Sequence, residues 1–184
     1  MIYLALLIAV YIGYMLIAAY LSRGIRNDLG SRKDMPPVSV VIPARNEEQC
    51  LPDLLDSLLQ VDYPMDRLQI IIINDQSTDR TREVAQSYQE KFQCRYDVHD
   101  VVDEPDGKLV LKTRPLAQGL DRATGEVILM TDADCIVTPS WIRTVASYFT
   151  PGVGMVCGTT LPHPQQHSRF PLTAFETLDW LFLL

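Results

Sequence analysis

Short apolar runs alternate with amphipathic segments over most of the chain. Runs that are apolar at nearly every position are typical of strands covered on both faces of a sheet. Strands are expected over Val38–Ile42, which Pro43 should end, and over Leu68–Ile73, Arg95–His99, Glu126–Met130 and Val153–Leu161.

Helices are expected between these strands, where apolar residues recur at helical spacing. Leu51–Leu58 has leucines at positions i, i+3, i+4 and i+7, and Val84–Phe92 carries a similar apolar stripe. Two more helices are expected over Lys112–Ala123, despite Pro115, and over Pro139–Phe149. Strands that alternate with helices favour an α/β fold with a mostly parallel sheet and right-handed crossovers.

Residues 1–22 differ from the rest because they form an apolar run without a charged side chain. As a helix rising about 1.5 Å per residue, this run is about 33 Å long, enough to cross a bilayer. Arg23, Arg26, Arg32 and Lys33 follow it, so the positive-inside tendency predicts a cell-membrane protein with its remaining domain in the cytoplasm. A cleavable signal peptide is the alternative, but no basic side chain precedes the run and no small-residue cleavage site closes it.

The chain therefore divides into four expected parts. A transmembrane helix over residues 1–22 is followed by a polar juxtamembrane linker over residues 23–37, with Gly30 and two prolines. A folded domain covers residues 38–161. Residues 162–184 are rich in Phe, Leu and Trp, which suits either a segment at the membrane interface or ordinary core.

Charge and cysteine content exclude some classes of protein. The formal net charge of -7 argues against a nucleic-acid partner, because nucleic-acid-binding domains usually display a basic face. An anionic ligand would therefore need a metal ion and a few local cations. The four cysteines show neither C-x-x-C nor zinc-finger spacing, which fits reduced thiols.

Polar clusters follow three of the expected strands, at Ala44–Glu47, Asn74–Ser77 and Thr131–Asp134. In parallel α/β sheets, ligands bind beyond the carboxyl ends of the strands. Asp132 and Asp134 flank one alanine, and residues i and i+2 of an extended segment face the same way, so both carboxylates can reach one divalent cation. Oxygen ligands suit Mg²⁺ or Mn²⁺, which complete their coordination with water and substrate phosphates. The alternative is a loop with two solvated acids.

The other clusters suggest contacts with an organic ligand. Asp75 can accept hydrogen bonds from a base N–H or a ribose hydroxyl, or it can simply brace the turn. Arg45, Asn46 and Glu47 can line the same pocket, although Asn46 and Glu47 also suit a helix cap. Lys112 is a candidate phosphate cation, Lys108 is a lesser one, and the pair His163 and His167 is a weak metal candidate because Pro164 disfavours a helix there.

Four motifs together resemble those of family 2 glycosyltransferases with the GT-A fold. They are Pro37–Glu48 (PVSVVIPARNEE), Ile73–Asp79 (INDQSTD), Lys112–Gly119 (KTRPLAQG) and Ala123–Asp134 (ATGEVILMTDAD). The resemblance covers roughly residues 38–161 in the family's order, and this is more specific than any single motif.

The resemblance implies a GT-A-type nucleotide-binding sheet and a nucleotide-sugar donor, often a UDP-sugar. It implies that Asp75 contacts the base or ribose and that Lys112 lies near the diphosphate. Asp134 would be the principal metal ligand, with Asp132 near the ribose or the metal. The expected donor-binding set is Pro43, Arg45, Glu47, Asp75, Lys112 and Asp132. The implied reaction is a metal-dependent, inverting transfer of the sugar to a lipid or polysaccharide acceptor.

Two departures from the family pattern stand out. Asn74 occupies a position where many relatives have aspartate. The acceptor-side Glu-Asp pair, which supplies the catalytic base, and a later Gln-x-x-Arg-Trp are absent, so we expect a truncated sequence whose base lies beyond the chain end.

Two other functions fit parts of the sequence. A membrane-tethered module that binds nucleotide-sugars without turnover needs only the donor motifs. A haloacid-dehalogenase-type phosphatase would use Asp132 as nucleophile and Asp134 as acid, but it needs a later lysine, and none follows Lys112.

Overall fold

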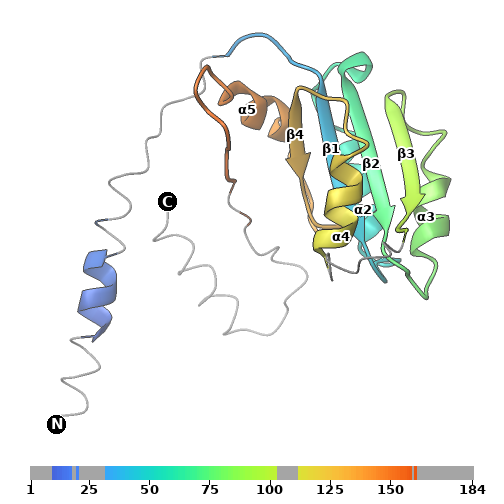
Figure 1. Ribbon diagram of the computed structural model, residues 1–184, viewed down its shortest axis with the longest axis horizontal. Coiled ribbons are helices and arrows are strands. Elements are labelled where there is room, and N and C mark those ends of the chain that lie inside the picture. The colour runs from blue at the N-terminus through green and yellow to red at the C-terminus, as the bar shows by residue number, and fades with distance from the viewer. Residues whose placement is uncertain (1–9, 18–19, 21–31, 103–111, 159, 161–184) are drawn as a thin grey trace. The chain divides into compact units, whose positions relative to one another are not determined.

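The computed structural model describes residues 10–17, 20, 32–102, 112–158 and 160 (Figure 1). Residues 32–102 and 112–156 belong to one compact unit, and the other described residues belong to a second unit.

In the second unit, residues 10–17 are helical. No helix within the described residues combines the length and apolar character needed to cross a bilayer. Much of the predicted membrane span over residues 1–22 lies outside the described residues, as do residues 23–31 of the predicted linker and all of residues 161–184.

The compact unit is built on a four-stranded parallel sheet with strand order β3-β2-β1-β4 (Figure 1). β1 spans Val38–Ala44, β2 Leu68–Asn74, β3 Arg95–Asp100 and β4 Val127–Met130. β1 pairs with β2 along its whole length but with β4 only from Val38 to Val41. The predicted α/β fold with a mostly parallel sheet is confirmed.

The first strand does not end before Pro43, as the sequence predicted, but continues through it to Ala44. The carbonyl of Ala44 accepts a hydrogen bond from the Asp75 N–H on the β2 side, so the backbone of Pro43 faces the β4 side. β4 has already stopped pairing there, and the missing N–H of proline removes no sheet hydrogen bond.

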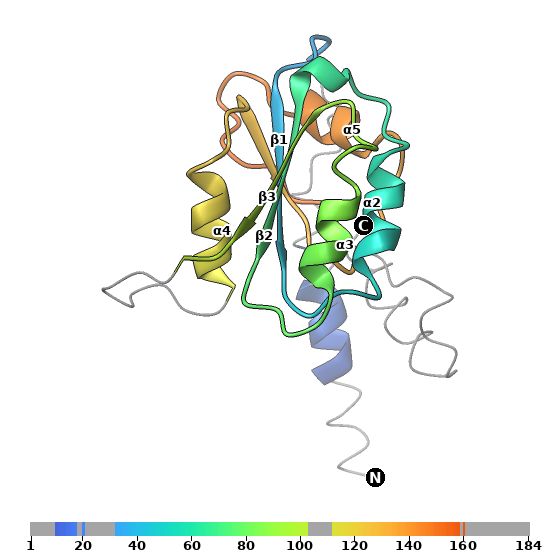
Figure 2. The same ribbon diagram turned by 90° about the vertical axis from the view of Figure 1, so that its right-hand side faces the viewer.

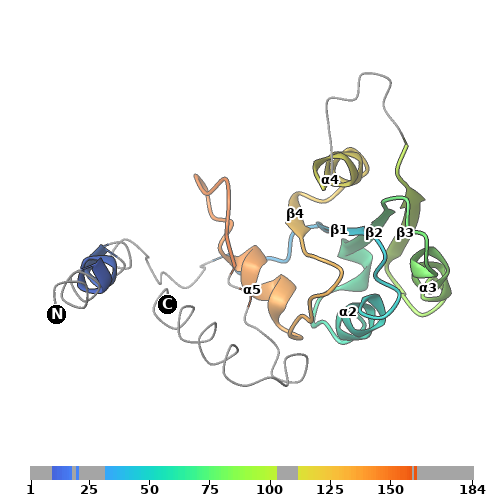
Figure 3. The same ribbon diagram turned by 90° about the horizontal axis from the view of Figure 1, so that it is seen from below.

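Helices cover both faces of the sheet. Their bounds are Leu51–Leu58 for α2, Thr81–Ser87 for α3, Thr113–Leu120 for α4 and Trp141–Ser147 for α5, and a short 3-10 helix, η1, covers Met65–Arg67. α4 lies on one face, and α2, α3 and α5 lie on the other (Figures 2 and 3). Pro115 fits into α4 because it lies in the first turn, where the backbone N–H groups have no partner within the helix.

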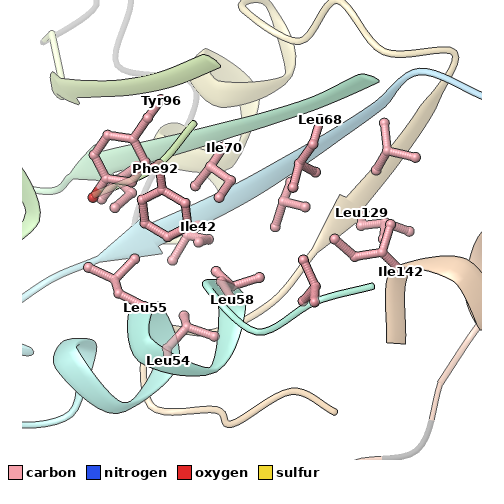
Figure 4. Packing of buried hydrophobic residues seen from close by; sticks show 14 of the residues in the cluster. Ile42, Leu54, Leu55, Leu58, Leu68, Ile70, Phe92, Tyr96, Leu129 and Ile142 are labelled. Carbon is pink, nitrogen blue, oxygen red and sulfur yellow. The ribbon is translucent and has the colours of Figure 1, made fainter. Parts of the chain in front are cut away.

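The main core fills the space between the sheet and the three helices on one face. Ile42 and Ile70 pack with Leu54, Leu55 and Leu58 of α2, and all five are fully buried (Figure 4). Burial of each side chain of this size contributes about 1.5–3 kcal/mol before conformational entropy is subtracted. A smaller cluster of Val41, Ile71 and Ile73 lies on the α4 face.

The predicted strand over Val153–Leu161 is wrong for its described part, residues 153–158 and 160, which contain no strand. Val153 closes a turn by donating its N–H to the carbonyl of Thr150 (3.0 Å), and 78% of Met155 is exposed. A strand needs a neighbour that pairs with its backbone groups, and an apolar run does not specify one.

The residues that lead into β1 are held to the compact unit. The Tyr63 hydroxyl donates to the carbonyl of Pro36 (2.6 Å), and Arg67 donates to the carbonyl of Met35 (2.6 Å). The N–H of Arg32 donates to the carbonyl of Ser147 (3.2 Å). These contacts fix the amino-terminal end of β1, opposite the edge where the polar clusters lie.

Candidate functional site

A pocket of about 250 Å³ lies at the carboxyl ends of β1, β2 and β4. The strands are parallel, so the loops that follow them meet at one edge of the sheet. The expected donor-binding set and the expected metal ligands Asp132 and Asp134 all line this pocket. The lining comprises Pro43, Ala44, Arg45, Glu47, Asp75, Lys112, Pro115, Asp132, Ala133 and Asp134.

The two aspartates after β4 lie in a turn and not in a continuation of the strand. The turn is closed by the N–H of Cys135, which donates to the carbonyl of Asp132 (3.3 Å). Ala133 is 3% exposed and packs in the main core, while Asp132 and Asp134 are exposed. The extended geometry expected from the sequence is therefore wrong. Both side chains still reach the pocket, because the small residue between them anchors the turn.

Lys112 faces the acidic end of the pocket. Its Nζ lies 2.6 Å from Oδ1 of Asp132, and both side chains are more than half exposed. Burial and the nearby carboxylates of Asp134, Asp79 and Asp132 raise the pKa of Glu47, whereas Lys112 acts in the opposite direction. Glu47, Asp132, Asp134 and Lys112 therefore share one electrostatic environment.

The backbone of α4 fixes where Lys112 lies. The carboxamide of Gln118 donates to the carbonyl of Val102 (2.6 Å) and accepts from its N–H (2.9 Å), which ties α4 to the end of β3. Lys112 immediately precedes the helix, and its carbonyl accepts a hydrogen bond from the N–H of Leu116 (3.3 Å).

Asp75 forms the opposite end of the pocket and is buried between two arginines. Nη2 of Arg114 donates to Oδ1 of Asp75 (2.8 Å), and Nη1 of Arg45 lies 3.9 Å from Oδ2. A buried carboxylate needs such partners, because an unpaired charge is costly to desolvate. The sequence did not single out Arg114. One sequence feature could have pointed to Arg114. Asp75 follows a buried strand and would need a cation nearby, and Arg114 lies two residues after Lys112, which was already expected at the same edge of the sheet.

The loops after β1 and β2 are joined by reciprocal hydrogen bonds. Asn46 accepts from the N–H of Thr78 (2.8 Å), and its own N–H donates to the Ser77 hydroxyl (3.0 Å). The N–H of Glu47 donates to the Thr81 hydroxyl (2.7 Å). Asn46 has a positive φ of 57°, which turns the chain between Arg45 and Glu47. Asn46 therefore connects the two loops and is not part of the pocket lining.

Further bonds extend the same loop pair. The N–H of Glu48 donates to Asp79 (3.1 Å), and the carboxylate of Glu48 accepts from the N–H of Arg80 (3.0 Å). The donors to Asp79 include the N–H and hydroxyl of Thr81. Burial alone would raise the pKa of Asp79, but these hydrogen bonds lower it overall.

Asn74 is not among the residues that line the pocket. Its side-chain amide donates to Oδ1 of Asp100 (2.8 Å), and Arg82 of α3 pairs with the other oxygen of Asp100 (3.0 Å). The departure from aspartate at this position therefore leaves the pocket lining unchanged. Lys108, His163 and His167 lie outside the described residues.

A larger cavity of about 770 Å³ lies near the amino-terminal end of β4. Three of the four charged side chains that line it contact one another, since Arg32 pairs with both Asp34 (2.8 Å) and Glu126 (2.8 Å). With Lys33, the described lining carries two positive and two negative side chains, so it shows no excess of positive charge for an anionic ligand.

The chemistry of the donor set suits a hard divalent cation. Among the described residues, no three His, Cys, Asp or Glu side chains are grouped to hold a metal. Asp132 and Asp134 supply carboxylate oxygens at the mouth of the pocket. Two such ligands fit Mg²⁺ or Mn²⁺, which keep several water molecules and bind substrate phosphates, better than they fit zinc.

Curated relatives match the central part of the chain. A "Probable glycosyltransferase YdaM" from Bacillus subtilis (strain 168) is 37% identical over 102 residues, which cover 55% of this chain and 24% of that protein. A 4,4'-diaponeurosporenoate glycosyltransferase from Staphylococcus aureus (strain USA300) is 41% identical over 97 residues, which cover 53% of this chain and 24% of that protein. The chain thus spans about a quarter of the length of these relatives.

Solved structures share the fold at lower identity. The mannosyltransferase PcManGT from Pyrobaculum calidifontis, in complex with GDP-Man and Mn²⁺, has a TM-score of 0.68 and 24% identity, covering 80% of this chain and 44% of that one. S. aureus TarS 1-349 in complex with UDP-GlcNAc has a TM-score of 0.50 and 23% identity, covering 65% of this chain and 37% of that one. These likenesses support a GT-A-like fold.

The family model "Glycosyl transferase family 2" matches residues 39–176, which include both the sheet and the pocket. That match extends over well more than half of the sequence, and the chain therefore belongs to glycosyl transferase family 2.

Proposed function

We propose that this protein is a glycosyltransferase that uses a UDP-sugar donor and Mg²⁺ or Mn²⁺, and that transfers the sugar with inversion to a lipid or polysaccharide. One observation carries the proposal: a single pocket has a buried aspartate between two arginines at one end and a carboxylate pair with a lysine at the other. A nucleoside diphosphate has a matching polarity, with a hydrogen-bonding base at one end and phosphates at the other.

The Asp75 end is complementary to uracil. An acceptor, Asp75, is flanked by two donors, Arg45 and Arg114, that approach its opposite oxygens. The Watson–Crick edge of uracil presents the inverse pattern, one N–H between two carbonyl oxygens. Guanine presents one carbonyl oxygen and two N–H donors, and cytosine has no central N–H. Sites built on such hydrogen bonds discriminate strongly, because a wrong base leaves polar groups unpaired.

The acidic end is suited to the phosphates. Asp134, with Asp132, would hold the cation, and Lys112 would contact the diphosphate as a point charge. A cation bound there supplies charge neutralisation for the departing diphosphate. The acceptor hydroxyl must also lose a proton as it attacks the anomeric carbon, and we assign that role to none of the pocket residues.

Calorimetry with the 184-residue chain in detergent tests this proposal. UDP should bind in the presence of Mn²⁺, and excess EDTA should weaken binding by at least about tenfold, because the bridging cation is worth more than one charged hydrogen bond. Asp134→Asn should abolish the Mn²⁺ dependence, while the exposed control Asp66→Asn should retain it. UDP affinity that is the same with Mn²⁺ and with EDTA would contradict the metal assignment.

A second experiment separates transfer from binding alone. Release of UDP from UDP-sugars, screened in the presence of Mn²⁺, should occur with at least one sugar if the chain is catalytic. Mn²⁺-dependent binding without any turnover would favour a membrane-tethered binding module. Family membership leaves no support for the phosphatase alternative.

A further inference from the structure

The contact between Lys112 and Asp132 joins two groups to which the proposed function gives different partners. Nζ of Lys112 lies 2.6 Å from Oδ1 of Asp132, the aspartate that would contact the cation or the ribose. Lys112 itself would contact the diphosphate. Lys112 and Asp132 are thus paired with each other in the absence of ligands, and this ion pair competes with the binding of either ligand.

The side chain of Lys112 can make that change without movement of the backbone. It is 56% exposed, it immediately precedes α4, and it ends in a compact charge on a flexible four-carbon stem. α4 is meanwhile fixed by the two hydrogen bonds between Gln118 and Val102. Rotation of the lysine side chain alone can therefore redirect its charge within the pocket.

The charges around Lys112 link its contact with Asp132 to the affinity of the pocket for cations. Glu47, Asp132 and Asp134 would form a strongly negative end of the pocket if Lys112 were absent. Such an end attracts divalent cations whether or not a donor is present. Lys112 offsets that attraction in the empty site, but a diphosphate withdraws Lys112 from Asp132 and so restores the carboxylate for the metal.

We propose that Lys112 is an exchangeable counterion that couples cation binding to donor binding. In the empty pocket it neutralises Asp132 and weakens binding of the free cation. With a nucleoside diphosphate it transfers to the phosphates, so that cation and donor bind together more tightly than either binds alone. This inference rests on the proposed function, because it requires a diphosphate at the Lys112 end of the pocket.

The proposed exchange predicts that one variant changes two affinities in opposite directions. Lys112→Met should bind Mn²⁺ alone about 2- to 5-fold more tightly, the range expected when an exposed ion pair that competes for Asp132 is removed. The same variant should bind UDP at saturating Mn²⁺ about tenfold or more weakly, because a charged hydrogen bond to phosphate is lost. A general loss of structure would weaken both affinities.

Electron paramagnetic resonance of free Mn²⁺ measures the first affinity, and calorimetry with UDP measures the second. Lys112→Arg, which keeps the charge, should bind Mn²⁺ alone as weakly as the original chain. Lys91→Met provides a matched control, since Lys91 is exposed and outside the pocket, and should change neither affinity.

Unchanged or weaker binding of Mn²⁺ alone by Lys112→Met would overturn the exchange while leaving the proposed function intact, provided that UDP still binds in an Mn²⁺-dependent way. If the unsubstituted chain does not bind UDP even with Mn²⁺, the proposed function fails and the inference fails with it.

Discussion

Asp75 shows how a single buried charge can set the chemistry of a site. Its carboxylate is 7% exposed and is held by Arg114, which is itself only 19% exposed. Such a pair fixes the orientation of both side chains, and a base that meets them must satisfy the hydrogen bonds that remain. In the proposed function, recognition of the base therefore depends on the charge of Asp75 as well as on the shape of its side chain.

Asp75→Asn should weaken UDP binding by about 1.5–3 kcal/mol, because a hydrogen bond to a charged acceptor is lost. The preference for UDP over CDP should also fall, since an amide N–H can donate to the central nitrogen of cytosine. Calorimetric titrations with both nucleotides measure this ratio, with the exposed Asp121→Asn as control. An unchanged UDP to CDP ratio would contradict the role of Asp75 in base selection.

The folding stability of the protein should depend on pH through the ionisation of Glu47. Burial, together with nearby carboxylates, raises its pKa in the folded state above the unfolded value. Ionisation of Glu47 therefore costs folding free energy; the cost is absent below the unfolded pKa and is complete above the folded pKa. Glu47→Gln should raise the Tm at pH 7, and the gain should disappear as the pH falls below about 4.

Thermal unfolding at several pH values between these limits checks the sign. Glu83→Gln, on the exposed side of α3, is the control for removal of an ordinary carboxylate. A Glu47→Gln variant that is less stable than the unsubstituted chain at pH 7 would show that the neighbouring carboxylates do not destabilise Glu47.

Sequence reasoning found the pocket residues that lie directly after strands, because the ends of parallel strands must converge. It missed Arg114 because the identity of a counterion depends on three-dimensional proximity between α4 and β2. It also predicted the wrong geometry for Asp132 and Asp134, because the turn depends on Ala133 fitting into the core, which the local pattern does not reveal.

At the level of elements, the loops after β1 and β2 act as one unit. Asn46 combines a positive φ with a side-chain acceptor for the N–H of Thr78, and Gln76 in the second loop also has a positive φ of 55°. The left-handed region is costly for most residues and is tolerated best by glycine and asparagine. The paired loops therefore hold Arg45, Glu47 and Asp75 around the pocket.

Two substitutions at Asn46 separate its backbone and side-chain contributions. Asn46→Gly loses the hydrogen bond from Thr78 but keeps a permitted positive φ, whereas Asn46→Ala loses both. We expect Asn46→Ala to be less stable than Asn46→Gly by about 1 kcal/mol, the approximate cost of the left-handed region for a residue with a Cβ. Urea unfolding measures the difference, and equal midpoints would show that the conformation at Asn46 is not strained.

Most elements were predictable because their apolar patterns are strong. β1, β2, β4, α2, α4 and α5 lie within a few residues of their predicted positions, and β3 appears where a weaker run suggested it. α3 overlaps the predicted stripe only in part, because the helix ends at Ser87, before Tyr88 and Phe92. Two predictions failed because they depend on the pairing of strands. β1 passes through Pro43 because its neighbour β4 is shorter, and residues 153–158 have no neighbouring strand within the described part. Neither property is encoded in the segment itself.

At the scale of the whole molecule, the chain belongs to glycosyl transferase family 2 and its compact unit has a GT-A-like fold. The chain spans about a quarter of the curated relatives that it matches, so acceptor and activity remain proposals. In the proposed function, the described pocket binds the donor and the metal.

The apolar run over residues 1–22 predicts a membrane anchor. The full chain should remain in the membrane pellet after an alkaline carbonate wash, and a variant lacking residues 1–22 should be released. Retention of the shortened variant as well would assign membrane association to another part of the chain, and release of the full chain would contradict the predicted anchor.

The most direct test of the central claim is anomalous diffraction from crystals of the chain grown with Mn²⁺ and UDP. We predict a manganese peak at Asp134, next to Asp132, with the diphosphate bound to the metal and the uracil edge at Asp75. A nucleotide bound elsewhere, or manganese absent from the two aspartates while UDP occupies the pocket, would contradict the account.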